Sequence, residues 1–197
     1  MKQNQTHRLV MTAMFAALTL LATSVLKIQT PAFGYIHIGE AFVLLSGLML
    51  GPKRGGAAAA IGSGLSDLMG GYAIWTPGTL LIKLLSAAAA GRLFRALTCR
   101  STPGADRQPN DPRARLASAV LLSCIPAEAL TIAGYFFYQI LITAFSTGSF
   151  SRASLASAVS LSAAEIPFNL AQAGAGILLA LVLFPVFTKL NRLSQRP

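Results

Sequence analysis

Ionisable side chains stand inside or beside apolar runs in this sequence. The stretch YIHIGEAF holds His37 and Glu40 three residues apart, where an apolar run begins, and Asp67, Lys83 and Glu165 fall in later runs. Such groups could transfer protons, pair with one another or bind a polar ligand. Each costs about 2.5–3.5 kcal/mol inside a bilayer and persists by pairing or by facing a wet cavity. The elements that carry them decide which role applies.

The composition indicates an integral membrane protein. Of 197 residues, 54% are hydrophobic and 11% are charged, against about 25% charged in a soluble domain. The net charge of +10 comes from Lys and Arg at the ends of apolar runs, without interleaved aromatics. That pattern reports membrane topology rather than nucleic-acid binding. Cys99 and Cys124 lack metal or disulfide spacing and are interpreted as small buried hydrophobes.

The apolar runs predict an all-α membrane protein with six transmembrane helices in a single domain, residues 1–197. A bilayer core requires about 20 apolar residues per helix, and the first run is read as a retained helix rather than a signal peptide. A solvated cytoplasmic linker is expected at 99–114 and a serine-rich outer loop at 145–161. The six predicted helices are 9–28, 34–51, 55–72, 77–97, 115–144 and 162–188.

The distribution of Lys and Arg predicts the orientation. With the N-terminus inside, only Lys27 and Arg152 of the sixteen basic residues fall outside, and Lys83 falls within a helix. Short basic loops stay cytoplasmic. The sequence therefore predicts a multi-pass protein of the plasma membrane with both termini in the cytoplasm.

In this topology, polar residues from five of the six helices lie in the outer half of the membrane. The inner halves consist of Ala, Leu, Val and Gly. The convergence predicts a ligand pocket that is open to the outside. The candidate binding residues are Glu40, Asp67, Trp75, Lys83, Tyr135, Gln139, Glu165, Asn169 and Gln172, with His37 and Tyr72 at the rim.

Several candidates also have a purely structural interpretation. Lys83 and Asp67 could form an ion pair instead of contacting ligand. Glu40 is expected to cap the helix that starts near it, because an acid is favourable at a helix N-terminus. Trp75 could be an interfacial aromatic residue.

Two features of the last helices have the same ambiguity. Glu165, Asn169 and Gln172 form one stripe of a helix, which could hydrogen-bond neighbouring helices or face a ligand. Glu128 follows Pro126, and we expect it to satisfy the backbone freed at that proline.

Other functional machinery is missing from the sequence. GPKRGG has neither the spacing nor the hydroxyl of a P-loop, so the chain is not expected to bind ATP. His37 and Glu40 are too few for a metal site, and no cofactor is expected. An intramembrane enzyme that uses His37 and Glu40, and a structural membrane subunit, remain alternative hypotheses.

Two long segments resemble the substrate-binding S components of energy-coupling factor (ECF) vitamin transporters, in particular the riboflavin and hydroxymethylpyrimidine-type subfamily. They are IHIGEAFVLLSGLMLGPKRGGAAAAIGSGLSDLMGGYAIWTPGTLLIKLLSAAAAG at 36–91 and IPFNLAQAGAGILLAL at 166–181. The motifs H-x-G-[DE]-A and T-x-x-I-K and a Gly-Pro turn carry the resemblance.

The resemblance implies a non-enzymatic protein with six helices that binds a vitamin with high affinity in an outward-facing pocket. It would reorient in the bilayer together with a transmembrane coupling protein and two ATP-binding subunits. Pyridoxine, hydroxymethylpyrimidine, thiamine, riboflavin and pantothenate are candidate ligands, and Trp75, Tyr135 and Tyr138 are candidate stacking partners. Ala13 and Ala17 would contact the coupling protein, as their small-xxx-small spacing allows. The loops 29–37, 72–77 and 145–161 would gate the pocket.

Overall fold

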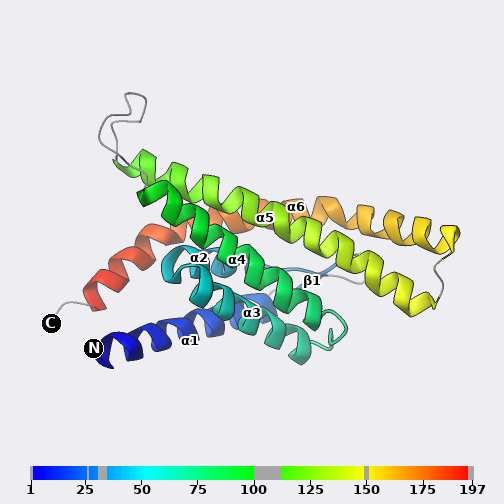
Figure 1. Cartoon of the computed structure of the whole chain (residues 1–197), viewed down its shortest axis with the longest axis horizontal. Helices are drawn as coiled ribbons and strands as arrows, with labels where there is room; N and C mark the ends of the chain where they lie inside the picture. The colour runs from blue at the N-terminus through cyan, green and yellow to red at the C-terminus, as the bar shows by residue number, and fades with distance from the viewer. Residues whose placement is uncertain (1, 26, 31–34, 100–111, 149–150, 195–197) are drawn as a thin grey trace.

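The computed structural model in Figure 1 describes residues 2–25, 27–30, 35–99, 112–148 and 151–194. The protein is all-helical apart from one short antiparallel hairpin. Its elements are α1 (Lys2–Val25), β1 (Ile28–Gln29), β2 (Tyr35–Ile36), α2 (Glu40–Leu50), α3 (Pro52–Met69), α4 (Thr76–Cys99), α5 (Pro112–Thr147) and α6 (Arg152–Ser194).

The helices form an elongated bundle around α2. Helix α2 packs against α1, α3, α4 and α6, while α5 and α6 run side by side along the long axis (Figure 1). Helix α1 begins and α6 ends at the same end of the bundle, and the α3–α4 turn lies at the other end. The core around α2 joins Phe15 of α1, Leu44 and Leu45 of α2, Val120 of α5 and Phe184 of α6.

Helix α2 is too short to span a membrane, so the predicted transmembrane helix at 34–51 is wrong. Its 11 residues extend about 16 Å, whereas a bilayer core is about 30 Å thick. The residues before it pair as β2 with β1 instead. The helix ends at Gly51, whose φ of 79° suits glycine, and Pro52 begins α3 at once.

Three of the described helical segments are long and apolar enough to cross a membrane: Gln5–Val25, Pro112–Thr147 and Arg152–Asn191. Helix α3 has 18 residues but carries Lys53, Arg54 and Asp67 among many glycines and alanines. The predicted six helices are therefore present in the described residues, but not as six equivalent apolar spans.

The predicted outer loop at 145–161 is also wrong, because most of it is helical. Helix α5 runs to Thr147 and α6 begins at Arg152. Ser151 caps α6, accepting a hydrogen bond from the backbone N–H of Ser154 at 3.2 Å. Further along, Ser157 donates back to the carbonyl of Ala153 at 3.0 Å, so these serines are compatible with a helix.

Two other expectations meet the structure only in part. Most of the predicted linker at 99–114 lies outside the described residues, and α4 and α5 reach Cys99 and Pro112 on either side. Cys124 is buried as expected, but Cys99 is exposed, so its interpretation as a buried hydrophobe is wrong.

Candidate ligand-binding cavity

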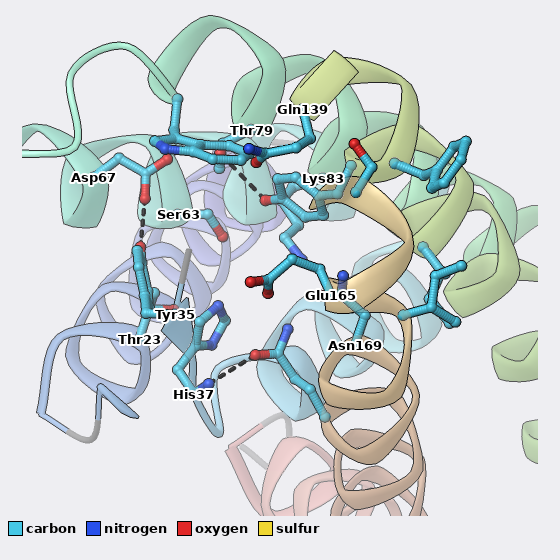
Figure 2. A pocket seen from close by; sticks show the side chains of 17 residues that line it. Thr23, Tyr35, His37, Ser63, Asp67, Thr79, Lys83, Gln139, Glu165 and Asn169 are labelled. Carbon is cyan, nitrogen blue, oxygen red and sulfur yellow. Dashed lines mark hydrogen bonds between the residues drawn. The ribbon is translucent and has the colours of Figure 1, made fainter. Parts of the chain in front are cut away.

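The α3–α4 turn, the β1–β2 hairpin and the neighbouring helices enclose a cavity (Figure 2). It holds about 710 Å³ of empty space, including the open mouth. The predicted residues that line it are His37, Asp67, Trp75, Lys83, Tyr135, Gln139, Glu165, Asn169 and Gln172. The structure thus brings nine of the eleven predicted binding and rim residues to one cavity; Glu40 and Tyr72 are not among its lining residues.

A buried ion pair forms the floor of this cavity. The Lys83 ammonium donates to Glu40 Oε1, and both side chains are fully buried. The same oxygen accepts a hydrogen bond from Gln172 Nε2 at 3.0 Å. Of the two roles considered for Lys83, the ion pair with Asp67 is not formed, because the close packing of α2 on α4 puts Glu40 next to Lys83 instead. Glu40 lies in the first turn of α2, as the capping prediction requires, but its side chain makes no capping hydrogen bond. Its Oε1 instead accepts hydrogen bonds from Lys83 and Gln172.

Gln172 links the floor to the segment that leads into α2. Its Oε1 accepts the backbone N–H of His37 at 2.7 Å (Figure 2), and His37 Nδ1 accepts the backbone N–H of Gly39 at 3.0 Å. Burial of the His37 ring lowers its pKa to about 3. The imidazole is therefore neutral at physiological pH and serves as an acceptor.

Asp67 is tied to the hairpin rather than to a cation. The Tyr35 hydroxyl donates to Asp67 Oδ1 (Figure 2), and burial is the main reason that the pKa of Tyr35 is raised. The Tyr35 ring packs 4.7 Å from the ring of Tyr72, and Lys27 Nζ lies 4.4 Å from the Tyr35 centroid. Tyr72 thus supports a residue at the cavity wall.

Aromatic rings close the cavity near the α3–α4 turn. The Trp75 ring lies 6.2 Å from Tyr135 and 6.0 Å from Tyr138. The Tyr135 hydroxyl is 3.2 Å from Thr79 Oγ1, and Lys83 Nζ is 5.0 Å from the Tyr135 centroid. Tyr138 is not among the lining residues; its hydroxyl donates to the carbonyl of Ile74 at 2.9 Å.

Glu128 does not have its expected role beside Pro126. Its side chain is buried, and neither carboxylate oxygen has a hydrogen-bond partner among the described residues. Hydroxyls bond the neighbouring backbone instead, since Ser86 and Thr131 both donate to the carbonyl of Ala127, at 3.0 and 3.2 Å.

Eight lining residues were not predicted from the sequence. Helical spacing could have found several, because Ser63 precedes Asp67 by four residues and Thr79 precedes Lys83 by four. The set is Thr23, Tyr35, Ser63, Thr79, Ile132, Phe136, Ser162 and Ile166.

Comparison with known proteins identifies the family of this chain. The family model described as "ECF-type riboflavin transporter, S component" matches residues 3–189. The chain belongs to this family. The structure of the S component of a bacterial ECF transporter has the same fold, with a TM-score of 0.58 and 17% identity over 98% of this chain and 99% of that chain.

A more local similarity links the chain to an uncharacterized protein from Pyrococcus woesei. The two are 33% identical over 79 residues, which is 40% of this chain. The match spans 53% of that relative, about half its length.

Family membership confirms the resemblance found in the sequence. ECF S components are membrane-embedded subunits of transporters and are not a class of enzymes. Ala13 and Ala17, the predicted contacts of a partner protein, are both exposed on α1.

Proposed function

We propose that this S component binds a flat heteroaromatic vitamin in the cavity and delivers it to an ECF importer. The observation that carries the proposal is that one cavity gathers the Trp75 and Tyr135 rings with the polar side chains of Gln139, Asn169 and Gln172. Small-molecule sites are typically apolar enclosures of about 300–1,000 Å³ with a few orienting polar groups. This cavity has the same mixture, with aromatic rings on its walls and a few polar side chains that point into it.

The floor of the cavity favours a rigid, pre-formed site. Lys83, Glu40 and Gln172 join α2, α4 and α6 through buried hydrogen bonds. A site fixed in this way loses little side-chain entropy when the ligand enters. The ring of the vitamin packs on the aromatic side chains, and the amides orient its polar substituents.

Transport requires partners that supply ATP hydrolysis, because the sequence contains no P-loop. The proposed partners are a transmembrane coupling protein, which docks on the exposed Ala13 and Ala17, and two ATP-binding subunits. The biased distribution of Lys and Arg supports cytoplasmic termini in the plasma membrane. In that orientation, the cavity near the α3–α4 turn faces outward.

Riboflavin is the first candidate ligand because the matching family model is described by it. Pyridoxine, hydroxymethylpyrimidine and thiamine share its flat heteroaromatic character. The argument for pantothenate is weaker, because the Lys83 ammonium that would bind its carboxylate is already paired with Glu40.

Thermal unfolding of the detergent-purified protein against these vitamins tests the proposal. A ligand that binds only the folded state adds about 2.7 kcal/mol of stability at a hundredfold excess over its Kd. We expect one vitamin to raise the melting temperature. Asn169→Ala should reduce this shift and Asn191→Ala, at the far end of α6, should not. A panel without any stabilising vitamin would contradict the proposal.

A further inference from the structure

One corner of the cavity has hydrogen-bonding capacity that the protein does not use. Thr23 Oγ1 of α1, and Ser63 Oγ and Asp67 Oδ2 of α3, have no hydrogen-bond partner among the described residues. All three residues line the cavity, and their exposed fractions are only 1%, 1% and 3%. Figure 2 shows them on the same side of the cavity, opposite Glu165 and Asn169.

Unused polar atoms at this depth are exceptional. Hydroxyls inside helices usually bond back to the preceding turn, as Thr19 does to the carbonyl of Phe15 at 2.8 Å, one turn before Thr23. A buried polar atom without a partner is costly. Three of them in one corner therefore indicate that a ligand or water supplies the missing hydrogen bonds.

The charges around the cavity restrict what this ligand can be. Asp67 and Glu165 line opposite sides, and Lys83, the cation among the described lining residues, is held by Glu40. Lys27 lies nearby, but its ammonium donates to the carbonyl of Ser66 at 3.1 Å and does not line the cavity. No lining cation in the described part of the chain is left to neutralise a carboxylate or phosphate.

From this geometry we infer that the protein selects an uncharged or cationic ligand whose hydroxyl or amino group donates to Asp67, Ser63 and Thr23, and that it rejects anionic forms. The inference rests on the proposed function and narrows its substrate class. It assigns Asp67 as the residue that determines specificity. A carboxylate or phosphate in this corner would meet like charge with no free counter-ion, which is strongly unfavourable in a low-dielectric site.

Matched pairs of vitamins test the inference with the purified full-length protein. Riboflavin is compared with flavin mononucleotide, pyridoxine with 4-pyridoxate, and thiamine with thiamine monophosphate. Hydroxymethylpyrimidine is compared with its phosphate, while pantothenate and nicotinate serve as further anions. We expect the tightest ligand to be uncharged or cationic and to bind at least a hundredfold more tightly than its anionic counterpart.

Three substitutions locate the selectivity. Thr23→Val and Ser63→Ala should each lower the affinity for the preferred ligand about threefold to tenfold, as expected for the loss of one hydrogen bond. Asp67→Asn keeps an oxygen for Tyr35 but removes the charge, so the ratio of neutral to anionic affinity should fall at least tenfold. Thr19→Val and Ser123→Ala are the matched controls, because these buried hydroxyls bond the backbone away from the cavity.

Each outcome has a distinct meaning. If a carboxylate or phosphate form of a heteroaromatic vitamin is the tightest ligand, the proposed function stands and this inference is overturned. If pantothenate is the tightest ligand, both are overturned, because pantothenate is anionic and has no aromatic ring. It is also overturned if the three variants bind like their controls while melting normally without ligand. If no member of the panel binds, the proposed function fails and the inference fails with it.

Discussion

Lys83 and Glu40 form an ion pair in which both charges are fully buried, so each charge depends on the other for its stabilisation. Removing one partner of a buried ion pair leaves an uncompensated charge, which typically costs about 3–5 kcal/mol. We expect Lys83→Met to lower the free energy of unfolding by that amount, as measured by thermal or denaturant unfolding in detergent. The double variant Lys83→Met/Glu40→Gln should recover part of the loss, because it leaves no charge unpaired.

The control for this substitution is Lys53→Met in α3. Lys53 is exposed, so its replacement should change stability by no more than about 0.5 kcal/mol. A Lys83→Met protein as stable as Lys53→Met would contradict the structural role of the pair.

We expect His37 to make the stability of the protein depend on pH. Its folded-state pKa of about 3 lies below the ordinary value of 6.5. Between these two pH values the unfolded chain therefore binds a proton that the folded chain does not, and stability falls as the pH is lowered. The free energy of unfolding then falls by at most about 1.4 kcal/mol for each pH unit. Melting temperatures between pH 7 and pH 5 should show this decline.

A His37→Gln variant tests the origin of this slope. Its amide oxygen can accept the Gly39 N–H but does not titrate, so the decline should become shallower. His7→Gln in α1 is the control and should retain the slope of the original protein. Equal slopes in the two variants would exclude His37 as the source.

For individual residues, the sequence predicted which side chains line the cavity better than it predicted which of them bond to one another. The predicted depth in the membrane was enough to assign Lys83, Glu165 and Gln172 to one site, and all three line the cavity. The partner of Lys83 was missed because it depends on how closely α2 packs on α4. Thr23 was missed because most buried hydroxyls bond their own helix, and the folded structure reveals the exceptions. Ser63 could have been found from its helical spacing to Asp67.

Close approach between helices sets the position of α2. A Cβ added at Gly176 of α6 would lie 2.6 Å from the Cβ of Glu40, whereas one added at Gly174 would meet nothing within 4 Å. Gly176→Ala should therefore destabilise the protein by about 1–3 kcal/mol through overpacking. Gly174→Ala should be neutral or stabilise by up to about 1 kcal/mol through helix propensity.

Unfolding of the two variants under identical conditions measures this difference. Because Gly176 contacts the residue that holds Lys83, its replacement should also weaken ligand binding. Equal stability of the two variants would show that α6 can shift away from α2 at little cost.

The elements show where periodicity and composition succeed and fail as predictors. Long apolar runs identified α1, α5 and α6 because length and hydropathy alone define a membrane span. The run at 34–51 failed because Gly39 and the β pairing of Tyr35 shorten the helix to 11 residues. The serine-rich segment at 145–161 failed because Ser151 caps a helix that alanines then extend.

For the molecule as a whole, the proposed ligand cavity and the proposed docking surface do not overlap. Ala13 and Ala17 are exposed on α1 and do not line the cavity. Replacing both with Leu should abolish vitamin uptake by cells that contain the coupling protein and ATPases, because bulky side chains prevent close helix contact. The ligand-dependent rise in melting temperature should be unchanged.

Ala133→Leu in α5 is the control, since Ala133 is exposed on a different helix. It should affect neither transport nor binding. Continued uptake by the Ala13→Leu/Ala17→Leu variant would place the docking surface elsewhere.

The ion pair at the floor of the cavity also has an electrical consequence. A membrane potential does work of about 2.3 kcal/mol on each elementary charge that crosses 100 mV. Lys83 and Glu40 carry opposite charges on contacting atoms, so a body that moves both through the bilayer moves no net charge with them. Voltage neither drives nor opposes the passage of this pair. In the proposed reorientation, the movement of this ion pair is therefore indifferent to whether the cell membrane is polarised.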